Sequence, residues 1–459
     1  MNQKDNLFYS FLEKNNSKLL SRINDTIKSI ESNKDLIWES FEGYDVKPLY
    51  HKKNTNPKIS LKKNFPDCWY VGHVLTVKNW RGIESEIKEL LDRGVESITL
   101  KLDTDKIEIK KFESLLNFGA KKFLLEINPK LKLVWLDDFF SLINSRSDLS
   151  INFDPFSSFA SSGEWNFSEK KDIDHWNKLQ LNFKEFNRIY VDGRIYQNSG
   201  ASIAEQIAFL LSHAIEYLSV LDKKSEKSKK TICFYISLGS NFFFEISKIK
   251  ALRILWDLIS REIAAKINCE IIVQPSNRNM TLYDYNINFL RTSTSCMSGI
   301  IGGANVINNL PYDSVYNSSN DFANRLAVNQ LLIFKHEAGF EKLENPASGS
   351  YYLEELTFEI IQKSLLIFKE IERKGGFLKN LKSNYIQDKI ASSANKEQIL
   401  FDKNDHVLVG INKFQNLSEK AISKIAKSCE NDFVKEKNKI RESRLSEKIE
   451  NDRIENENK

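Results

Sequence analysis

The feature of this chain that most constrains its fold is a regular alternation of short apolar runs and helical patterns between residues 68 and 307. Eight runs are bounded by polar turn residues, as is typical of buried strands. The predicted strands are Cys68–Leu75, Ser97–Leu102, Lys121–Ile127, Ser150–Asp154, Arg188–Asp192, Thr231–Leu238, Cys269–Gln274 and Ala304–Ile307. The predicted helices between them are Trp80–Arg93, Ile109–Phe118, Leu131–Asn144, His175–Phe186, Ile203–Leu221, Phe243–Ala265 and Tyr283–Ile300. Strands that alternate with helices form a parallel sheet with helices outside.

The number of these units decides between two α/β architectures. Eight strand–helix units over about 240 residues match a (β/α)₈ TIM barrel, and a doubly wound open sheet is the alternative. The count of eight favours the barrel. The eighth strand has the weakest pattern, because Gly302-Gly303 precedes it and Asn308-Asn309 follows it.

Two segments flank the predicted barrel, which with later helices occupies residues 66–414. Residues 1–65 form an N-terminal extension, and their extended stretch GYDVKPLY covers Gly43–Tyr50. An amphipathic helix near the start is indicated by Phe8, Phe11, Leu12, Leu19 and Ile23. An apolar stripe of this size needs a surface to cover, either on a partner subunit or on its own barrel.

Residues 415–459 differ in composition from the rest of the chain. They contain 11 Lys and Arg and 10 Asp and Glu, so 21 of these 45 residues are charged, with Phe433 as the one aromatic residue. A segment of this kind buries little apolar surface. We therefore expect a charged tail, helical or disordered, and no C-terminal Rossmann-like domain.

Composition excludes several classes of function. The net charge is +5, from 67 basic and 62 acidic residues, and no cluster of basic residues suggests a nucleic-acid partner. No apolar run approaches the length of a membrane span. The five cysteines are scattered without a CxxC pair, which favours free thiols in a reducing compartment and a cytoplasmic protein.

Common catalytic and cofactor motifs do not occur in the sequence. There is no GxGxxG, no GxxxxGK[ST] and no GxSxG. His336-Glu337 begins an HExxH motif, but Phe340 occupies the place of the second histidine. The six histidines have no close histidine or cysteine partner, so we expect no metal site.

Two stretches invite a functional interpretation. Residues 191–200, VDGRIYQNSG, follow the fifth predicted strand directly, and barrel enzymes place their sites at the carboxyl ends of strands. Residues 291–313, RTSTSCMSGIIGGANVINNLPYD, combine small residues on a helix with a Gly-Gly turn. An ordinary loop and a tightly packed helix and turn are the respective alternatives.

Longer motifs resemble a known family. They include the segment from Asp192, DGRIYQNSGASIAEQIAFLLSHAIEYL, the segment ISLGSNFFFEISKIKALRILW at Ile236–Trp256, and RTSTSC at Arg291. NPASGSYYLEELT at Asn345–Thr357 and LVGINKF at Leu408–Phe414 continue the series in consistent order. On these residues the chain resembles the methylmalonyl-CoA mutase family, and within it the small, non-catalytic subunit.

The resemblance implies a (β/α)₈ barrel with an N-terminal extension, residues 1–65, that contacts a partner subunit. Active members of the family carry acyl-CoA along the barrel axis and hold adenosylcobalamin in a separate C-terminal α/β domain. The cofactor supplies the radical chemistry, and the protein orients the substrate and excludes water.

Several residues depart from the family pattern. Arg194-Ile195 stands where active members have a Tyr-His pair, and an isoleucine side chain cannot transfer a proton. Asn308-Asn309-Leu310 replaces a His-Thr-Asn sequence, and the segments at Cys68–His73 and Asn152–Phe156 lack the family's tyrosine and substrate-binding motifs. No histidine lies in a DxHxxG motif, which supplies the lower cobalt ligand.

Together these departures predict a barrel without mutase chemistry of its own. The degenerate catalytic positions are Arg194, Ile195 and Asn308, and the resemblance implies remnant substrate-pocket positions at Gly193, Gln197, Gly200, Arg291, Thr292 and Gly303. The implied role is the silent small subunit of a heterodimeric methylmalonyl-CoA mutase of propionate metabolism, with adenosylcobalamin in the large subunit and no cofactor on this chain. A free-standing acyl-CoA-binding or regulatory barrel and an enzyme that has repurposed Arg194 are the alternatives.

Overall fold

The computed structural model describes most of the barrel and its flanking segments. The described residues are 21–22, 25, 37–50, 65–104, 108–127, 149–182, 188–221, 230–263, 267–317, 320–342, 344–420 and 439–457. The predicted helix Leu131–Asn144 and all five residues of the N-terminal apolar stripe lie outside them. Among the described helices, none combines the length and apolar character needed to span a bilayer.

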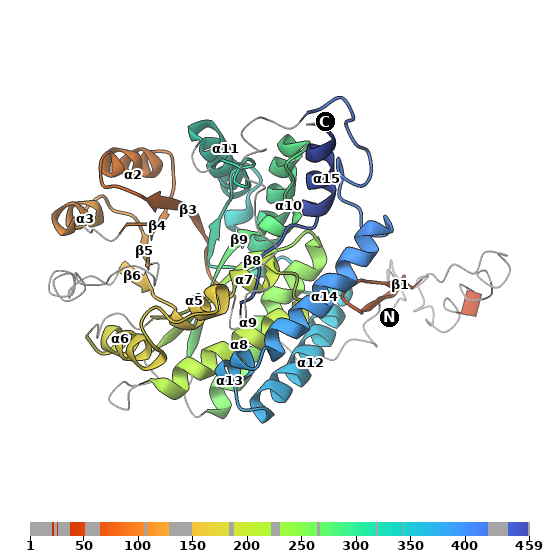
Figure 1. The fold of residues 1–459 in the computed structure, drawn as a ribbon, viewed down its shortest axis with the longest axis horizontal. Helices are drawn as coiled ribbons and strands as arrows, with labels where there is room; N and C mark the ends of the chain where they lie inside the picture. Colours follow the sequence, from red (N-terminus) through yellow and green to blue (C-terminus); the bar gives the residue numbers. More distant parts are fainter. Residues whose placement is uncertain are drawn as a thin grey trace, which may run out of the picture.

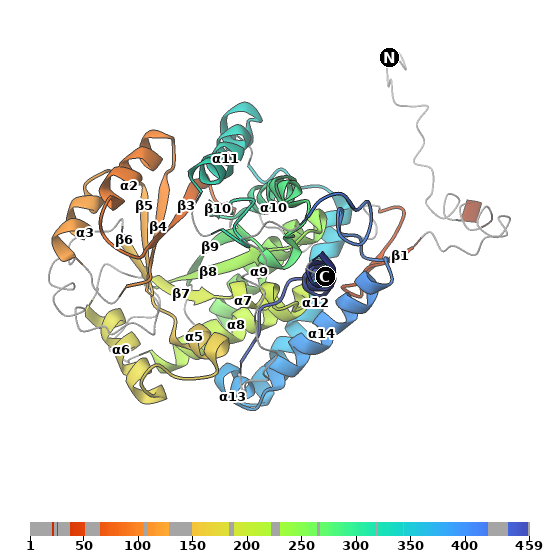
Figure 2. The ribbon, with the colours of Figure 1, turned by 45° about the horizontal axis from the view of Figure 1, so that its top comes forward.

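Eight parallel strands form the nearly closed barrel that the sequence predicts (Figures 1 and 2). The strands are β3 (Tyr70–Val77), β4 (Ser97–Leu102), β5 (Lys122–Ile127), β6 (Leu149–Asn152), β7 (Arg188–Asp192), β8 (Thr231–Leu238), β9 (Asn268–Pro275) and β10 (Val306–Asn308). Their order is β6-β5-β4-β3-β10-β9-β8-β7. Along the chain, β3 is the first strand of the barrel and β10 the last, and these two pair, with Tyr70 opposite Val306. Between β6 and β7, Arg188 Nη1 donates to Ser150 Oγ at 3.5 Å.

Helices connect the strands around the outside of the barrel. They are α2 (Ile83–Asp92), α3 (Ile109–Leu116), α5 (Pro155–Ser162), α6 (Glu169–Asn182), α7 (Arg194–Asn198), α8 (Ile203–Val220), α9 (Phe242–Glu262), α10 (Asn288–Gly302) and α11 (Asp321–Leu332). A 3₁₀ turn, η3 (Asn277–Asn279), follows β9. Helix α8 starts at a capping box, in which Ser202 accepts from the Glu205 amide and Glu205 accepts from the Ser202 amide.

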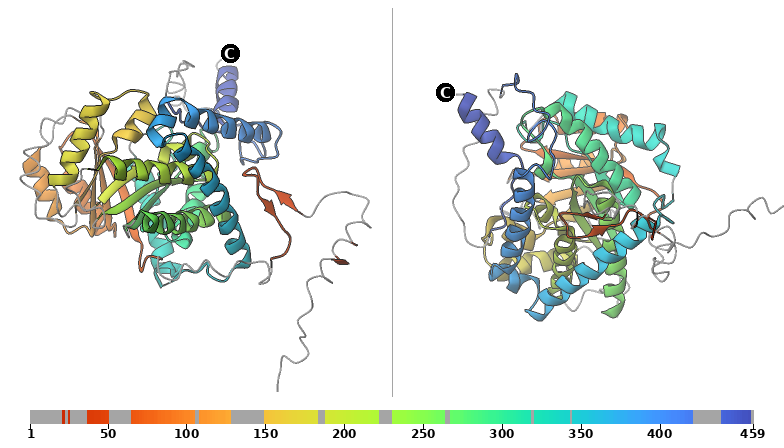
Figure 3. Two further views of the ribbon diagram at one scale, coloured as in Figure 1. Left: turned by 90° about the horizontal axis from the view of Figure 1, so that it is seen from below. Right: turned by 90° about the vertical axis from the view of Figure 1, so that its right-hand side faces the viewer.

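A second layer of helices covers part of this ring. It consists of α12 (Tyr351–Arg373), α13 (Phe377–Lys382) and α14 (Tyr385–Asp402), and α12 packs on α8 and α9 (Figure 3). This layer explains why α8 is buried on nearly every side despite its place on the outside of a barrel. The apolar composition of α8 is therefore typical of a helix that is buried between the barrel strands and a second layer of helices.

The described part of the N-terminal extension contacts its own barrel. Strands β1 (Trp38–Glu39) and β2 (Asp45–Val46) form an antiparallel pair. Tyr44 is buried, and its ring lies 5.8 Å from the ring of Phe244 on α9. Residues 37–50 thus have an intramolecular packing role, while Trp38 keeps half of its surface exposed.

Residues 439–446, which we call the C-terminal strap, cross the carboxyl ends of the strands and lead into α15 (Glu447–Glu457). The Ile440 amide donates to Ala160 after β6, and the Ser443 amide donates to Asn198 after β7. Ile440 and Leu445 are buried. Helix α15 confirms the expected helical, charged tail, and the two apolar residues of the strap both reach the barrel.

Candidate functional site

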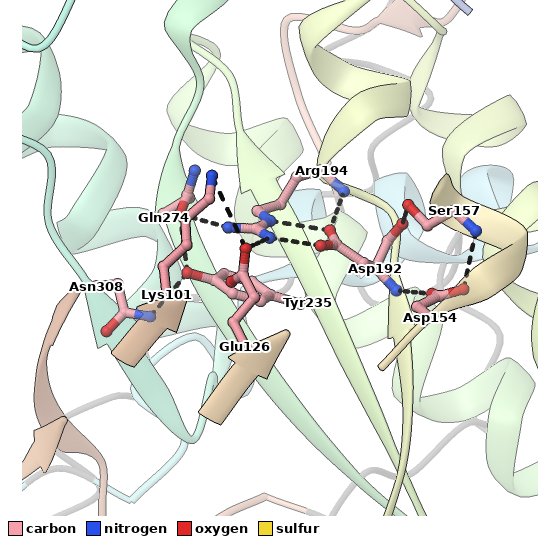
Figure 4. Close-up of polar contacts among 9 residues, drawn as sticks. All are labelled: Lys101, Glu126, Asp154, Ser157, Asp192, Arg194, Tyr235, Gln274 and Asn308. Atoms are coloured by element: carbon pink, nitrogen blue, oxygen red, sulfur yellow. Dashed lines mark hydrogen bonds and ion pairs between the residues drawn. The ribbon is translucent and has the colours of Figure 1, made fainter. Parts of the chain in front are cut away.

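The carboxyl end of the barrel holds a cluster of paired charges centred on Arg194 (Figure 4). Arg194 is the first residue of α7, directly after β7. Its Nη2 lies 2.5 Å from Asp192 Oδ2 and 2.9 Å from Glu126 Oε1, and its Nε donates to Asp192 Oδ1 at 2.9 Å. The guanidinium also stacks 3.9 Å from the centre of the Tyr235 ring. The edge and one face of this cation are therefore engaged by the protein itself.

The charges of this cluster hold one another in their ionised forms. Burial opposes ionisation of the Asp192 carboxyl, but the charge and hydrogen bonds of Arg194 outweigh it and keep the Asp192 pKa below its usual value. Burial likewise opposes the Arg194 cation, and the charges of Asp192 and Glu126 raise the Arg194 pKa. Two carboxylates thus neutralise Arg194, so it has little capacity left to bind an external anion.

Neutral polar groups and one lysine complete the layer around the Arg194 cation. The Tyr235 hydroxyl donates to Gln274 Oε1 at 2.8 Å, and Asn308 Nδ2 donates to the Tyr235 oxygen at 2.9 Å. Burial raises the Tyr235 pKa, so the phenol stays protonated. Lys101 approaches Glu126 at 3.9 Å. Together with Asp192, these residues come from six strands, and the layer links most of the barrel circumference.

A second buried network supports the loop that carries Arg194. Asp154, after β6, accepts from the Asp192 amide at 2.8 Å and from the Tyr217 hydroxyl at 2.5 Å. The Asp154 carboxylate also lies 3.1 Å from His213 Nε2, and His213 Nδ1 lies 3.2 Å from the Tyr196 oxygen. This acid–histidine–hydroxyl series has the composition of a catalytic triad, but all its side chains are buried. It therefore positions α7 and offers no accessible nucleophile.

Below the mouth, side chains fill the barrel interior. The inward-facing layer consists of Tyr70, Leu124, Tyr190, Cys233, Tyr235, Ile272 and Val306. At the amino ends of the strands, Glu270 pairs with Lys122 at 2.8 Å and with Arg188 at 3.2 Å. A hollow of about 70 Å³ at that end is bounded by members of the inward-facing layer. The described residues therefore leave no open channel along the barrel axis.

The C-terminal strap covers the mouth from outside. Arg278 Nη1 donates to the Ser443 carbonyl at 3.0 Å, and the Leu445 amide donates to the Arg278 carbonyl at 2.9 Å. Burial raises the pKa of the Glu442 carboxyl, while a hydrogen bond from Asn198 and the charge of Arg194 lower it. The strap thus places one more acidic group beside an already neutralised arginine.

The three positions predicted to be degenerate have different environments. Arg194 and Asn308 belong to the charged layer at the mouth. Ile195 is 4% exposed and packs in the main apolar core. The side chain at position 195 therefore lies outside the cluster that its neighbour forms.

The remnant-pocket positions do not converge on one site. Gly193 packs against α8, since a Cβ there would lie 2.3 Å from Leu210 Cδ2. Gln197 and Gly200 line a separate cavity beside α7. Gly303 lies at the opposite end of the barrel, where its carbonyl accepts from Arg253 Nη2 at 2.7 Å.

Arg291 and Thr292 lie near the start of α10. Arg291 Nη1 donates to Thr281 Oγ1 at 2.9 Å and to Asn288 Oδ1 at 2.8 Å, and burial lowers the Arg291 pKa to about 10. Thr292 Oγ1 donates to the Phe289 carbonyl within the helix. Both side chains have local structural partners.

Sequence reasoning missed most partners of Arg194. Glu126 and Gln274 were assigned only to strands, and Tyr235 was counted as an apolar strand residue. A charged or amide side chain inside an otherwise apolar strand was the available signal, because such a group needs a buried partner. Among the described residues, no group of three His, Cys, Asp or Glu side chains is placed to ligate a metal ion.

Comparisons with known proteins agree on one family. The family model described as methylmalonyl-CoA mutase matches residues 145–456. The methylmalonyl-CoA mutase small subunit of Porphyromonas gingivalis is 28% identical over 92% of this chain and 73% of its own length. The methylmalonyl-CoA mutase of Rhizobium meliloti is 31% identical over 52% of this chain, and the 2-hydroxyisobutanoyl-CoA mutase large subunit of Aquincola tertiaricarbonis is 28% identical over 51%. The matches cover 34% and 43% of those two relatives.

Proposed function

Because the chain belongs to the methylmalonyl-CoA mutase family, we propose that it is the catalytically silent small subunit of a heterodimeric, adenosylcobalamin-dependent mutase. The complex would interconvert methylmalonyl-CoA and succinyl-CoA. In this proposal the large subunit binds cofactor and substrate, and this chain stabilises the large subunit through a permanent interface.

The observation that carries the proposal is that side chains fill the axis of the barrel. A substrate that must reach the axis would meet the paired charges of Arg194 and then the packed layer around Tyr190 and Ile272. Opening this route would separate buried ion pairs, and a buried charge that loses its partner costs several kcal/mol. This argues equally against a free-standing acyl-CoA-binding barrel, because that function also needs space on the axis.

The residues at the mouth do not fit a corrin cofactor. The strap lies against the segments that follow β6, β7 and β9, where a ligand above the barrel would have to lie. His213 is buried and held by Asp154 and Tyr196, so its imidazole is not available as a cobalt ligand. We therefore derive no catalytic step on this chain.

Co-expression with a mutase large subunit tests the proposal. We expect a stable one-to-one complex on size-exclusion chromatography, mutase turnover by the complex, and no turnover by this chain alone. The isolated chain should retain no corrin absorbance after incubation with adenosylcobalamin and desalting. Turnover without a partner, or a chain that stays monomeric beside the large subunit, would contradict the proposal.

A further inference from the structure

A cavity of about 220 Å³ lies beside α7, apart from the Arg194 cluster. Four segments form its walls: Phe41–Gly43 of the N-terminal extension, residues 200–203 before and at the start of α8, residues 239–241 before α9, and residues 393–397 of α14. At about 30 Å³ for each water in the liquid, this volume corresponds to roughly seven waters. It is large enough for a small organic group.

Four glutamates line this cavity, and two of them already have a cationic partner. Glu245 Oε2 lies 2.5 Å from Lys248 Nζ, and Glu397 Oε2 lies 2.7 Å from Arg278 Nε. The Lys248 and Arg278 side chains are almost completely buried, so these pairs are internally neutral.

The other two glutamates, Glu42 and Glu205, have only neutral donors. Glu205 Oε2 accepts from the Ser202 amide at 2.9 Å and from Ser393 Oγ at 2.7 Å. Glu42 Oε2 accepts from the Ile203 amide at 2.8 Å. Lys396, an exposed residue, is the remaining cation that lines the cavity. Neither carboxyl has a cationic partner, and one exposed ammonium faces both, so the cavity has a negative balance when Glu42 is ionised.

A buried amide without a partner also faces this space. Asn279 is 7% exposed and lines the cavity, and no other described residue forms a hydrogen bond with its side chain. Gly239 brings two further polar atoms together, since a Cβ built there would lie 3.0 Å from both Gln197 Nε2 and Glu245 Oε1. The Asn279 and Glu245 side-chain oxygens are thus acceptors on the cavity wall, whereas Gln197 Nε2 is a donor.

We propose that this cavity binds a small guanidinium cation, with Glu42 and Glu205 as its charge partners and Asn279 as an additional acceptor. A guanidinium with one alkyl substituent has five N–H donors, and it forms short, charge-assisted hydrogen bonds with carboxylates. A metal ion fits less well, because the described residues hold no group of three carboxylate, histidine or cysteine side chains placed to ligate one.

The ionisation of Glu42 adds a pH dependence to this site. Burial raises the Glu42 pKa to about 8, against the opposing hydrogen bond from Ile203, and the charges of Glu397 and Glu245 raise it further while Lys248 lowers it. Glu205, Lys396, Arg278 and His406 complete the charged and titratable groups around the cavity. A cation binds better to ionised Glu42, so its affinity should increase as pH rises through about 8.

Calorimetric titration of the full chain with propylguanidinium tests the proposal. We expect saturable binding that is about tenfold tighter near pH 9 than near pH 7, the ratio of ionised Glu42 at the two pH values. Propylurea, a neutral analogue of similar shape, should not bind measurably. Equal binding of propylurea, or no saturable binding of propylguanidinium up to about 10 mM, would overturn the proposal.

Matched variants locate the site. Glu42→Gln keeps an acceptor for the Ile203 amide and should lower the affinity at least about tenfold at high pH, with loss of the pH dependence. Asn279→Ala should also weaken binding. Glu39→Gln, an exposed position in the same segment, is the control and should bind as the unmodified chain does. Unchanged affinity and pH dependence in Glu42→Gln would refute the assignment.

The same guanidinium chemistry could come from a free molecule or from a protein arginine. A blocked Gly-Arg-Gly peptide distinguishes these sources. Binding at least as tight as that of propylguanidinium indicates an arginine side chain, and much weaker binding indicates a free small molecule. Both results keep the cation site.

Discussion

At the scale of single residues, Arg194 and its ion-pair partners fill the mouth of the barrel. Its two carboxylate partners come from β5 and β7, and Tyr235 covers one face of the guanidinium. Arginine suits this position because its planar fork pairs with more than one acceptor and also stacks on an aromatic ring. Arg194 is thus the centre of a structural cluster.

Arg194→Met should destabilise the protein strongly. The change leaves Asp192 and Glu126 buried without their cation, and removing one partner of a buried pair costs on the order of 3–5 kcal/mol. Urea unfolding measures this loss. Arg261→Met, which removes an exposed helix pair with Asp257, is the matched control and should cost less than about 1 kcal/mol. Equal effects of the two changes would contradict the role of the cluster.

Ile195→His should create no mutase activity and should lower stability. The new imidazole would lie in the apolar core, where a polar group without a partner costs about 1–3 kcal/mol. Thermal unfolding and a mutase assay of the purified variant give the two readouts. Ile195→Val, which keeps the apolar contact, is the control with an expected loss of about 0.5–1.5 kcal/mol. Partner-free turnover by Ile195→His would disagree with this account.

His73 on β3 should make the fold sensitive to acid. Burial, with a smaller effect from Arg93, lowers its pKa to about 4. The unfolded chain, with an ordinary histidine pKa near 6.5, binds the proton more readily, so stability is complete above about pH 6.5 and declines towards pH 4. His73→Leu should remove up to about 3 kcal/mol of this decline in unfolding experiments. His336→Gln, a change at an exposed position, should leave this acid-dependent decline in stability unchanged.

At the scale of elements, the strands were predictable because each is a local apolar run. All eight predicted strands are present, and even β10, with three residues, pairs with both β3 and β9. Helix ends were harder to place. The helix predicted from Tyr283 begins at Asn288, because Asp284 has a left-handed conformation and a 3₁₀ turn follows it. The strap was not predicted, since its partners are distant in sequence.

Leu445 anchors the strap, and Leu445→Ala should reveal its contribution. The side chain is 1% exposed, and truncating a buried leucine typically costs about 2–5 kcal/mol. Chemical denaturation gives the size of the effect, and hydrogen exchange at Ser443 and Leu445 reports local release. Leu417→Ala, at a position 81% exposed, should change stability by less than about 0.5 kcal/mol. Matching losses at both leucines would show that the strap is weakly held.

At the scale of the whole molecule, the extension has two parts with different expected roles. Within residues 37–50, Trp38 and Tyr44 pack on Phe244 of α9. The Tyr44 ring also contacts Lys363 of α12. The apolar stripe that precedes residues 37–50 lies outside the described residues. The family resemblance assigns the extension to a partner contact, and the structure assigns residues 37–50 to the barrel itself.

Deleting residues 1–36 should weaken association with the large subunit and leave the barrel folded. Permanent interfaces commonly bury 2,000 Å² or more, so removing an apolar arm should lower the affinity measurably, by about tenfold or more. Circular dichroism checks the fold, and biosensor titration with the large subunit gives the affinity. Deleting residues 458–459 serves as a truncation control. An unchanged affinity in a folded protein would exclude the arm from the interface.

The strap also sets an order of events during synthesis. Roughly 130 residues separate the end of β10 from the first residue of the strap, and at about 5–20 residues per second they take on the order of ten seconds to make. Strands β3–β10 and the Arg194 cluster are complete before that interval begins. A nascent chain therefore presents an uncovered mouth on the ribosome, and chaperones or a partner can meet that surface before the chain covers it.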